Sequence, residues 1–219
     1  KKYSGICLFL PNLEKIDYKR IRQGVGKYPI ISLTPMKNPT IDTVSFDSYS
    51  GGYMIAKHFE EQGYKNFGIV SGPGDAVDAV FRKNGFVDHI SEKEDLKLVW
   101  EYKGDFSSES GRDAFNDYKN QNIPDMAIFG CNDHTCFGFM KEALEAGFKI
   151  PKDFIIAGYD NLSFCENFTP ELTSVATNFD ILGKRAIRTI ENMVNDSNEI
   201  IRQFSMVPVE IVIRSSTQN

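Results

Sequence analysis

Short apolar runs alternate with segments of helical periodicity along nearly the whole chain. The apolar runs are rich in Ile, Val and Phe, and glycine or polar clusters bound most of them. We expect strands at 5–10, 29–33, 43–46, 67–71, 98–102, 126–129, 154–158, 173–176 and 207–213. We expect helices at 11–23, 48–61, 76–92, 107–120, 133–145 and 178–195. Such alternation is typical of βαβ units, so the predicted fold class is α/β with parallel sheets.

Polar side chains follow two of the expected strands at the point where each strand ends. Asn132 and Asp133 follow the run at 126–129, and Asp160 and Asn161 follow the run at 154–158. Ligands bind outside the carboxyl ends of strands in open parallel sheets. A carboxylate accepts from hydroxyl groups and an amide both donates and accepts, which suits a sugar. We favour ligand contact for Asn132 and Asp160. For Asp133 and Asn161, helix capping or turn formation is an equal alternative.

Length and charge limit the functional classes. A chain of 219 residues can form one large α/β domain or two smaller lobes. The net charge is −5, so no basic field indicates nucleic-acid binding by these residues themselves. Lys184, Arg185 and Arg188 form a basic stripe on an expected helix. Our first interpretation is a solvated helix face, and the second is a surface near DNA or a partner.

The cysteines indicate a reducing compartment. Cys7, Cys131, Cys136 and Cys165 form no CxxC pair and lie in or beside apolar runs, as reduced core cysteines do. The first apolar run, at 6–10, is too short for a signal peptide or a membrane span. We therefore expect a cytoplasmic protein without membrane contact.

Other constellations give little support for catalysis or for a bound cofactor. Cys131, Asp133, His134 and Cys136 are close in sequence but lack the paired spacing of a zinc site, so we expect no metal. No nucleophile motif lies near any of the histidines. The glycine-rich stretch at 71–75 lacks a phosphate-binding pattern. We expect no catalytic residues and no cofactor.

An ordered set of motifs resembles the effector-binding domain of the lactose and galactose repressor family, over nearly the whole chain. Any one motif is weak evidence, but the set in this order and spacing is specific. The segments that carry it lie at 29–31, 44–47, 51–52, 56, 63–65, 69–72, 82–86, 104–106, 109–111, 124–125, 131–133, 138, 147–153, 158–161, 170–173 and 213–217.

The resemblance implies two Rossmann-like lobes with parallel sheets, joined by three crossover strands in the periplasmic binding protein-like arrangement of type I. Residues 1–46 and 177–204 would form the N-terminal lobe, and 47–176 and 205–219 the C-terminal lobe. The crossings would fall at 43–47, at 175–178 and near 201–205.

The resemblance also implies a set of ligand-binding residues. Arg82, Asn132 and Asp160 would be polar ligands of the C-terminal lobe, and Phe106 its aromatic wall. Arg82 offers a rigid fork of donors, and Phe106 an apolar face for sugar C–H groups. At the crossings, Phe46, Asp47 and Thr177 would contribute further contacts.

Three departures from the family pattern change the expectation. These residues contain no helix-turn-helix or basic hinge pattern, so we expect the DNA-reading module of the family to lie outside them. The stretch at 5–29 has the spacing of the family's third strand, third helix and fourth strand, so the N-terminal lobe is expected to be incomplete. In an alternative alignment, residues 11–25 form the family's first unit, with an internal deletion before Tyr28. Thr34 stands where many sugar-binding members have Asp or Arg.

The sequence thus predicts the sensor domain of a sugar-responsive transcription regulator. Its partners would be a small effector, a second copy in a homodimer, and DNA through a domain outside these residues. The alternative is a periplasmic solute-binding protein of a sugar transporter. An enzyme is the third and least supported class.

Overall fold

The structure is a computed structural model that describes residues 3–10, 15–36, 40–121, 123–195 and 203–218. The chain forms two compact units, each assembled from separate stretches of sequence. The first unit contains Lys1–Asp47, Ala76–Asp78 and Asn178–Pro208, and the second contains Ser48–Asp75, Ala79–Thr177 and Val209–Asn219.

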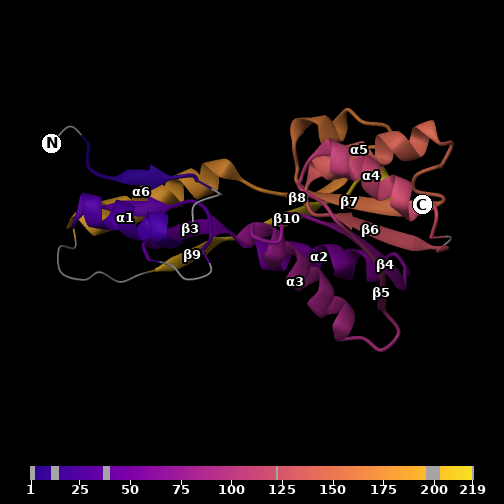
Figure 1. The fold of residues 1–219 in the computed structure, drawn as a ribbon, viewed down its shortest axis with the longest axis horizontal. Coiled ribbons are helices and arrows are strands. Elements are labelled where there is room, and N and C mark those ends of the chain that lie inside the picture. Colours follow the sequence, from indigo (N-terminus) through magenta and orange to yellow (C-terminus); the bar gives the residue numbers. More distant parts are fainter. Residues whose placement is uncertain (1–2, 11–14, 37–39, 122, 196–202, 219) are drawn as a thin grey trace. The chain divides into compact units, whose positions relative to one another are not determined.

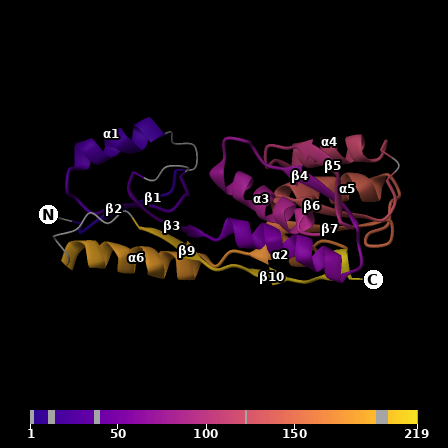
Figure 2. The same ribbon diagram turned by 90° about the horizontal axis from the view of Figure 1, so that it is seen from below.

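The first unit is a parallel four-stranded sheet between two helices (Figure 2). Its strand order is β1-β2-β3-β9, with β1 at Ile6–Leu8, β2 at Ile30–Ser32, β3 at Asp42–Phe46 and β9 at Phe204–Val207. Helix α1 (Lys15–Val25) and helix α6 (Phe179–Asn195) cover opposite faces. Because side chains alternate along a strand, Ile30 packs with Tyr18 of α1, whereas Ile31 packs with Leu182 of α6.

The second unit is a six-stranded sheet in the order β10-β8-β7-β6-β4-β5, parallel except for the antiparallel edge pair β10 and β8. Its strands are β4 (Asn66–Ser71), β5 (Lys97–Lys103), β6 (Met126–Gly130), β7 (Phe154–Asp160), β8 (Thr173–Ala176) and β10 (Glu210–Val212). Figure 1 shows α2 (Ser48–Glu61) and α3 (Val77–Ser91) on one face, with α4 (Ser108–Tyr118) and α5 (Asp133–Glu145) on the other.

Aromatic side chains fill the core of the second unit. Phe86 of α3 touches Phe59, Phe67 and Phe129, with ring centroids 5.1–6.2 Å apart. All four rings are fully buried. Burying each one contributes roughly 1.5–3 kcal/mol. The core therefore holds α3, and the residues that α3 carries, firmly against the sheet.

The end of the chain differs from the expected single strand at 207–213. Two strands occur there, β9 and β10, and Pro208 lies between them. Proline has no backbone N–H for a sheet ladder, so it ends β9. β9 pairs with β3 in the first unit and β10 pairs with β8 in the second.

The boundaries between the units also differ in detail from those expected. They fall after Asp47, Thr177 and Pro208, whereas the sequence placed them after Phe46, Ala176 and Phe204. Ser205 belongs to the first unit because β9 continues its pairing with β3 as far as Val207. Residues 201–202, part of the expected third crossing, lie outside the described residues, as do 11–14 at the expected start of the first helix.

Candidate functional site

An arginine on α3 joins the carboxyl ends of two neighbouring strands in the second unit. Nη1 of Arg82 donates to the carbonyl oxygen of Cys131, just beyond β6, at 2.6 Å. Nη2 donates to Oδ1 of Asp160, the last residue of β7, at 3.1 Å. The Arg82 side chain is 11% exposed and that of Asp160 is 26% exposed, so the carboxylate faces solvent more than its partner does. The pair therefore presents a fixed charge constellation at the strand ends.

Two aromatic rings complete the surroundings of Arg82. The guanidinium carbon lies 3.8 Å from the ring centroid of Tyr159 and 5.7 Å from that of Phe106. Such stacking is favourable because the ring face is electronegative. A Cβ at Gly72 would lie only 2.3 Å from the Phe106 ring, so only glycine leaves room for this ring position. We call Arg82, Asp160, Phe106, Asn132 and Tyr159 the strand-end cluster.

Two residues of the strand-end cluster, and Asn161 directly after Asp160, have an unusual backbone conformation. Phe106, Asp160 and Asn161 have φ angles of 72°, 109° and 54°. Non-glycine residues rarely adopt positive φ, and such strain persists mainly where function requires it. Among the described residues, Asp125 is the only other non-glycine residue with positive φ. The strain is thus concentrated where the sequence predicted ligand contacts.

Asn132 caps helix α5. Its side-chain oxygen accepts from the backbone N–H of Thr135 at 3.0 Å, and its amide donates to the carbonyl oxygen of Phe106 at 2.9 Å. The first bond satisfies a backbone donor of the helix start, and the second fixes the loop that carries Phe106. Asn132 therefore positions the aromatic ring as well as the helix.

The sequence left capping and ligand contact equally open for Asp133 and Asn161. In the structure both side chains accept hydrogen bonds from other residues of the second unit. Asp133 is fully buried and accepts from Oγ of Ser174 at 2.6 Å and from the backbone N–H of Leu162 at 2.8 Å. Burial raises the pKa of Asp133 to about 6. The side-chain oxygen of Asn161 accepts from Nη2 of Arg214 at 2.8 Å. Both residues hold the loop that follows β7.

The remaining predicted residues lie at the ends of β3 and β8. Phe46 and Asp47 belong to the first unit, where the Phe46 ring meets that of Phe179 edge to face at 5.2 Å. Thr177 belongs to the second unit, and its hydroxyl donates to the carbonyl oxygen of Asp160 at 3.1 Å. The second unit thus brings Thr177 together with the strand-end cluster.

Sequence reasoning missed Tyr159 and Gly72 as parts of the site. Tyr159 stands in the Gly-Tyr-Asp-Asn motif, but its contact with Arg82 depends on how α3 packs on the sheet. Gly72 follows β4, and its role appears only once the Phe106 ring lies against it. A glycine directly after a central strand was the available signal for a close approach.

The buried thiols are poor nucleophiles. Burial raises the pKa of Cys131 to about 12 and that of Cys136 well above its ordinary value. No group of three or more His, Cys, Asp or Glu side chains within the described residues could hold a metal ion. In that same part of the chain, no helix is long and apolar enough to cross a membrane.

Comparison with known proteins identifies the family. The profile of the periplasmic binding protein-like domain matches residues 56–217. The chain is 31% identical to the HTH-type transcriptional repressor PurR of Mannheimia succiniciproducens, over all of this chain and 65% of that protein. It is 32% identical to PurR of Photobacterium profundum, over 84% of this chain and 55% of that protein. The chain thus spans less than two thirds of the length of these relatives.

Solved structures show the same fold. A dimeric lac repressor with an 11-residue C-terminal deletion superposes with a TM-score of 0.87 at 22% identity, over 97% of this chain and 77% of that chain. A LacI family regulator from Enterococcus faecalis, solved with bound ribose, gives 0.83 at 27% identity, over 99% and 78%. The chain therefore belongs to the periplasmic binding protein-like domain family, and it is similar to repressors and regulators of the LacI family.

Proposed function

We propose that the strand-end cluster binds a small polyhydroxylated effector, a sugar or a sugar derivative. The observation that carries this proposal is the Arg82–Asp160 pair, held at the strand ends by strained backbone and flanked by Phe106. In the full-length protein, effector binding changes the DNA affinity of a domain outside these residues, in the cytoplasm and within a homodimer. A ligand shifts such an equilibrium only by its different affinity for the two states.

The chemistry of the cluster suits neighbouring hydroxyl groups. A carboxylate has about four lone-pair sites and can accept from two adjacent hydroxyls, while Arg82 donates in a rigid fork. Phe106 is partly exposed and presents an apolar face against which the C–H face of a sugar can pack. We assign Asp160 and Arg82 the polar contacts, and Phe106 the apolar one.

Three further residues have supporting roles in this proposal. Thr177 holds the backbone of Asp160 through its hydroxyl, so it fixes the direction of the carboxylate. Asn132 holds the loop of Phe106 and uses its remaining hydrogen-bonding capacity for the ligand. We assign Phe46 and Asp47 to effector contact as well, on the family resemblance.

The relatives suggest two kinds of effector. A ribose molecule is bound in the Enterococcus faecalis regulator, which favours a pentose or a similar sugar. The curated relatives are PurR repressors, which are not named for a sugar. A flat nitrogen heterocycle could also stack on Phe106 while it hydrogen-bonds to Asp160. The proposal therefore includes sugars joined to such a base as the second effector class.

A thermal-shift screen tests this proposal on the 219-residue chain. The panel contains ribose and other monosaccharides, sugar phosphates, nucleosides and free nucleobases. A true effector at 100 times its Kd stabilises the folded chain by about 2.7 kcal/mol, which raises the melting temperature by roughly 5–10 °C. The compound must be recovered chemically unchanged, since turnover would indicate an enzyme. A panel without any stabilising sugar or nucleoside would contradict the proposed function.

A further inference from the structure

A relay of hydrogen bonds in the second unit links the buried carboxyl group of Asp133 to the backbone of Asp160. Oγ of Ser174 on β8 donates to Oδ1 of Asp133 at 2.6 Å and accepts from the backbone N–H of Asn161 at 3.0 Å. That N–H belongs to the peptide unit between Asp160 and Asn161. The hydroxyl of Thr177 donates to the carbonyl oxygen of the same peptide unit at 3.1 Å. Both sides of this peptide unit are therefore held.

Asp133 also holds the next residue of the loop directly. Its Oδ2 accepts from the backbone N–H of Leu162 at 2.8 Å. Asp160 and Asn161 have positive φ angles of 109° and 54°. Because non-glycine residues rarely adopt such angles, this backbone persists only while its surroundings hold it. One buried side chain thus fixes, directly or through Ser174, the two residues that follow Asp160.

The direction of the relay depends on whether Asp133 is ionised. An ionised carboxylate only accepts hydrogen bonds, and both of its oxygens face donors here. A protonated carboxyl group has to donate one. The N–H of Leu162 cannot accept it, so the proton has to lie on Oδ1 and the Ser174 hydroxyl has to turn and accept. Protonation therefore reverses the hydrogen bond that leads to the backbone of Asp160.

The charge of Asp160 links the two carboxyl groups a second time. Burial raises the pKa of Asp133 to about 6, although the hydrogen bonds from Ser174 and Leu162 lower it, and the charge of Asp160 raises it further. An effector whose hydroxyls donate to Asp160 offsets part of this negative charge. Such an effector therefore favours the ionised form of Asp133.

Two buried thiols also interact with Asp133, and they stay neutral. Burial raises the pKa of Cys136 on α5 and of Cys165 in the short helix η1 (Ser163–Glu166). Neither thiol changes its charge below pH 8. The charged side chains around this cluster form two ion pairs, Arg82 with Asp160 and Arg214 with Glu166.

We propose that Asp133 is a positioning residue of the effector site, and that its ionised form holds Asp160 in the direction that binds the effector. This inference rests on the proposed function of the strand-end cluster. Effector binding then releases the proton of Asp133 to the buffer. By reciprocity, the affinity for the effector rises as pH rises through the titration of Asp133. Asp133 acts through Ser174 and the loop, because its own side chain is fully buried.

An NMR titration of the 219-residue chain tests the relay without any effector. The backbone amide signal of Asn161 should move with pH and share its midpoint with the carboxyl carbon of Asp133. In Ser174→Ala the amide should no longer follow that titration, because the connecting hydroxyl is missing. In Asp160→Asn the midpoint of Asp133 should move to lower pH, because a neighbouring negative charge is gone. An Asn161 signal that does not follow Asp133 would overturn the proposal.

Calorimetry with ribose as the probe tests the link to binding. The Kd should be about threefold lower at pH 7.5 than at pH 5, within the tenfold limit that one pKa unit sets. Near pH 6 the binding enthalpy should vary with the ionisation enthalpy of the buffer, because the buffer takes up the released proton. Asp133→Asn cannot titrate, so it should lose both effects, whereas a merely structural role would lower stability and leave them. Ser174→Ala, which should reduce the change in Kd, is the second variant if Asp133→Asn does not fold.

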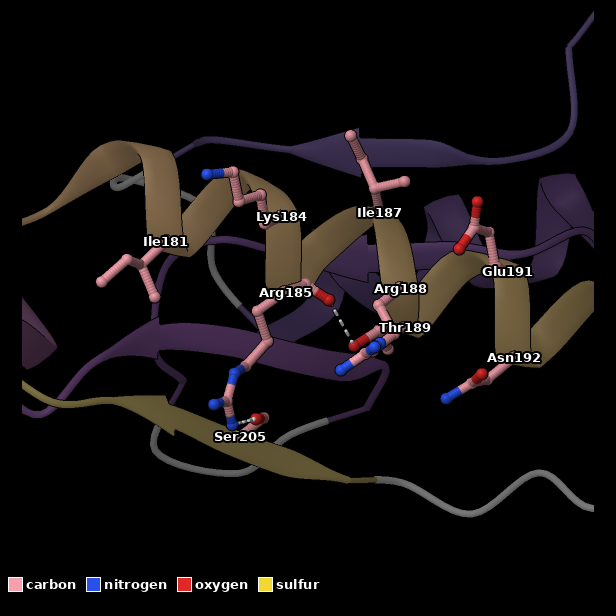
Figure 3. Close-up of a pocket in the computed structure, with 9 residues that line it drawn as sticks. All are labelled: Ile181, Lys184, Arg185, Ile187, Arg188, Thr189, Glu191, Asn192 and Ser205. Atoms are coloured by element: carbon pink, nitrogen blue, oxygen red, sulfur yellow. Dashed lines mark hydrogen bonds between the residues drawn. The ribbon is translucent and has the colours of Figure 1, made fainter.

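Two controls separate Asp133 from other titrating groups. His134 is exposed beside Asp133, and histidine changes its charge between pH 5 and pH 8, so His134→Gln should keep both effects. Glu191→Gln makes the same change from carboxylate to amide in the first unit, where the exposed Glu191 lines a pocket on α6 (Figure 3). It should bind ribose with the pH dependence of the unsubstituted chain.

The two experiments fail in different ways. If neither ribose nor any other compound of the panel binds at either pH, the proposed function is wrong, and the Asn161 signal alone decides whether the relay exists. If ribose binds with equal Kd at pH 5 and pH 7.5, Asp133 does not position the effector site. The same conclusion follows if a folded Asp133→Asn variant keeps the pH dependence, or if His134→Gln abolishes it.

Discussion

Two carboxylates at the ends of neighbouring strands have different tasks because their surroundings differ. Asp160 ends β7, is about a quarter exposed and pairs with Arg82. Asp133 begins α5, is fully buried and accepts hydrogen bonds from Ser174 and Leu162. The sequence favours ligand contact for Asp160 but leaves ligand contact and capping equally open for Asp133, because the burial of Asp133 depends on the neighbouring strand β8 and the loop after β7. Exposure therefore marks Asp160 as the ligand candidate and Asp133 as the anchor of the loop.

The buried carboxyl of Asp133 should make stability depend on pH. Its pKa is raised from an ordinary value of 3.8 to about 6, so the folded state holds this proton more tightly than the unfolded state does. This stabilisation is fully present below about pH 3.8 and is lost as pH rises through about 6. The free energy of unfolding should fall by about 3 kcal/mol in all over this range. Urea unfolding from pH 4 to pH 6.5 measures this loss.

The matched variant for this pH dependence is Asp133→Asn. The asparagine cannot titrate, so its unfolding free energy should fall less between pH 4 and pH 6.5 than that of the unsubstituted chain. The variant is expected to be less stable at every pH, because an amide cannot accept both hydrogen bonds as a carboxylate does. Two curves of equal slope over this interval would show that Asp133 keeps an ordinary pKa.

At the scale of elements, glycines set the helix packing that places Arg82. A Cβ on Gly85 of α3 would lie 1.9 Å from the carbonyl oxygen of Tyr49 in α2, and a Cβ on Gly52 of α2 would lie 1.9 Å from that of Arg82. The two helices therefore touch backbone to backbone. The sequence shows these glycines inside helical periods, but only the packing explains why an alanine would not fit there.

The variant Gly85→Ala should separate α2 from α3. Because the added methyl group meets backbone rather than a flexible side chain, we expect a loss of about 1–3 kcal/mol in the free energy of unfolding. Effector affinity should fall too, since Arg82 lies one turn away on the same helix. The matched control is Gly183→Ala in α6, where no atom lies within 4 Å of the added Cβ.

In the control, the gain in helix propensity should raise stability by up to about 1 kcal/mol. Melting temperature and urea unfolding distinguish the two glycine variants. Similar shifts in both variants would show that close approach at Gly85 does not limit the packing of α2 on α3.

At the scale of the whole molecule, alternating apolar and amphipathic segments were enough to predict the α/β class, and motif order was enough to predict the family. The end of the chain was not predicted correctly. Residues 207–213 read as one apolar run, but Pro208 divides it between two sheets. Which sheet a short strand joins depends on pairing partners far away in sequence. Local pattern does not encode that choice.

The sequence was enough to predict which polar residues lie together at the candidate site, but not the contacts that hold them in place. Arg82, Asn132 and Asp160 stand in motifs, and the structure places them together at the strand ends. The capping role of Asn132 and the stacking of Tyr159 on Arg82 depend on contacts between separate elements. Residue type and strand position thus indicate a site, whereas its geometry comes from tertiary packing.

The most direct test of the central claim is a calorimetric titration of the best effector from the screen into the unsubstituted chain and Asp160→Asn. We expect Asp160→Asn to lose about 1.5–3 kcal/mol of binding free energy, which raises the Kd roughly 10- to 150-fold, because the hydrogen bonds to a charged group are lost. The control Asp95→Asn breaks an exposed ion pair with Lys65 elsewhere on the second unit and should bind like the unsubstituted chain. Unchanged affinity in a folded Asp160→Asn variant would contradict the assignment of the strand-end cluster as the effector site.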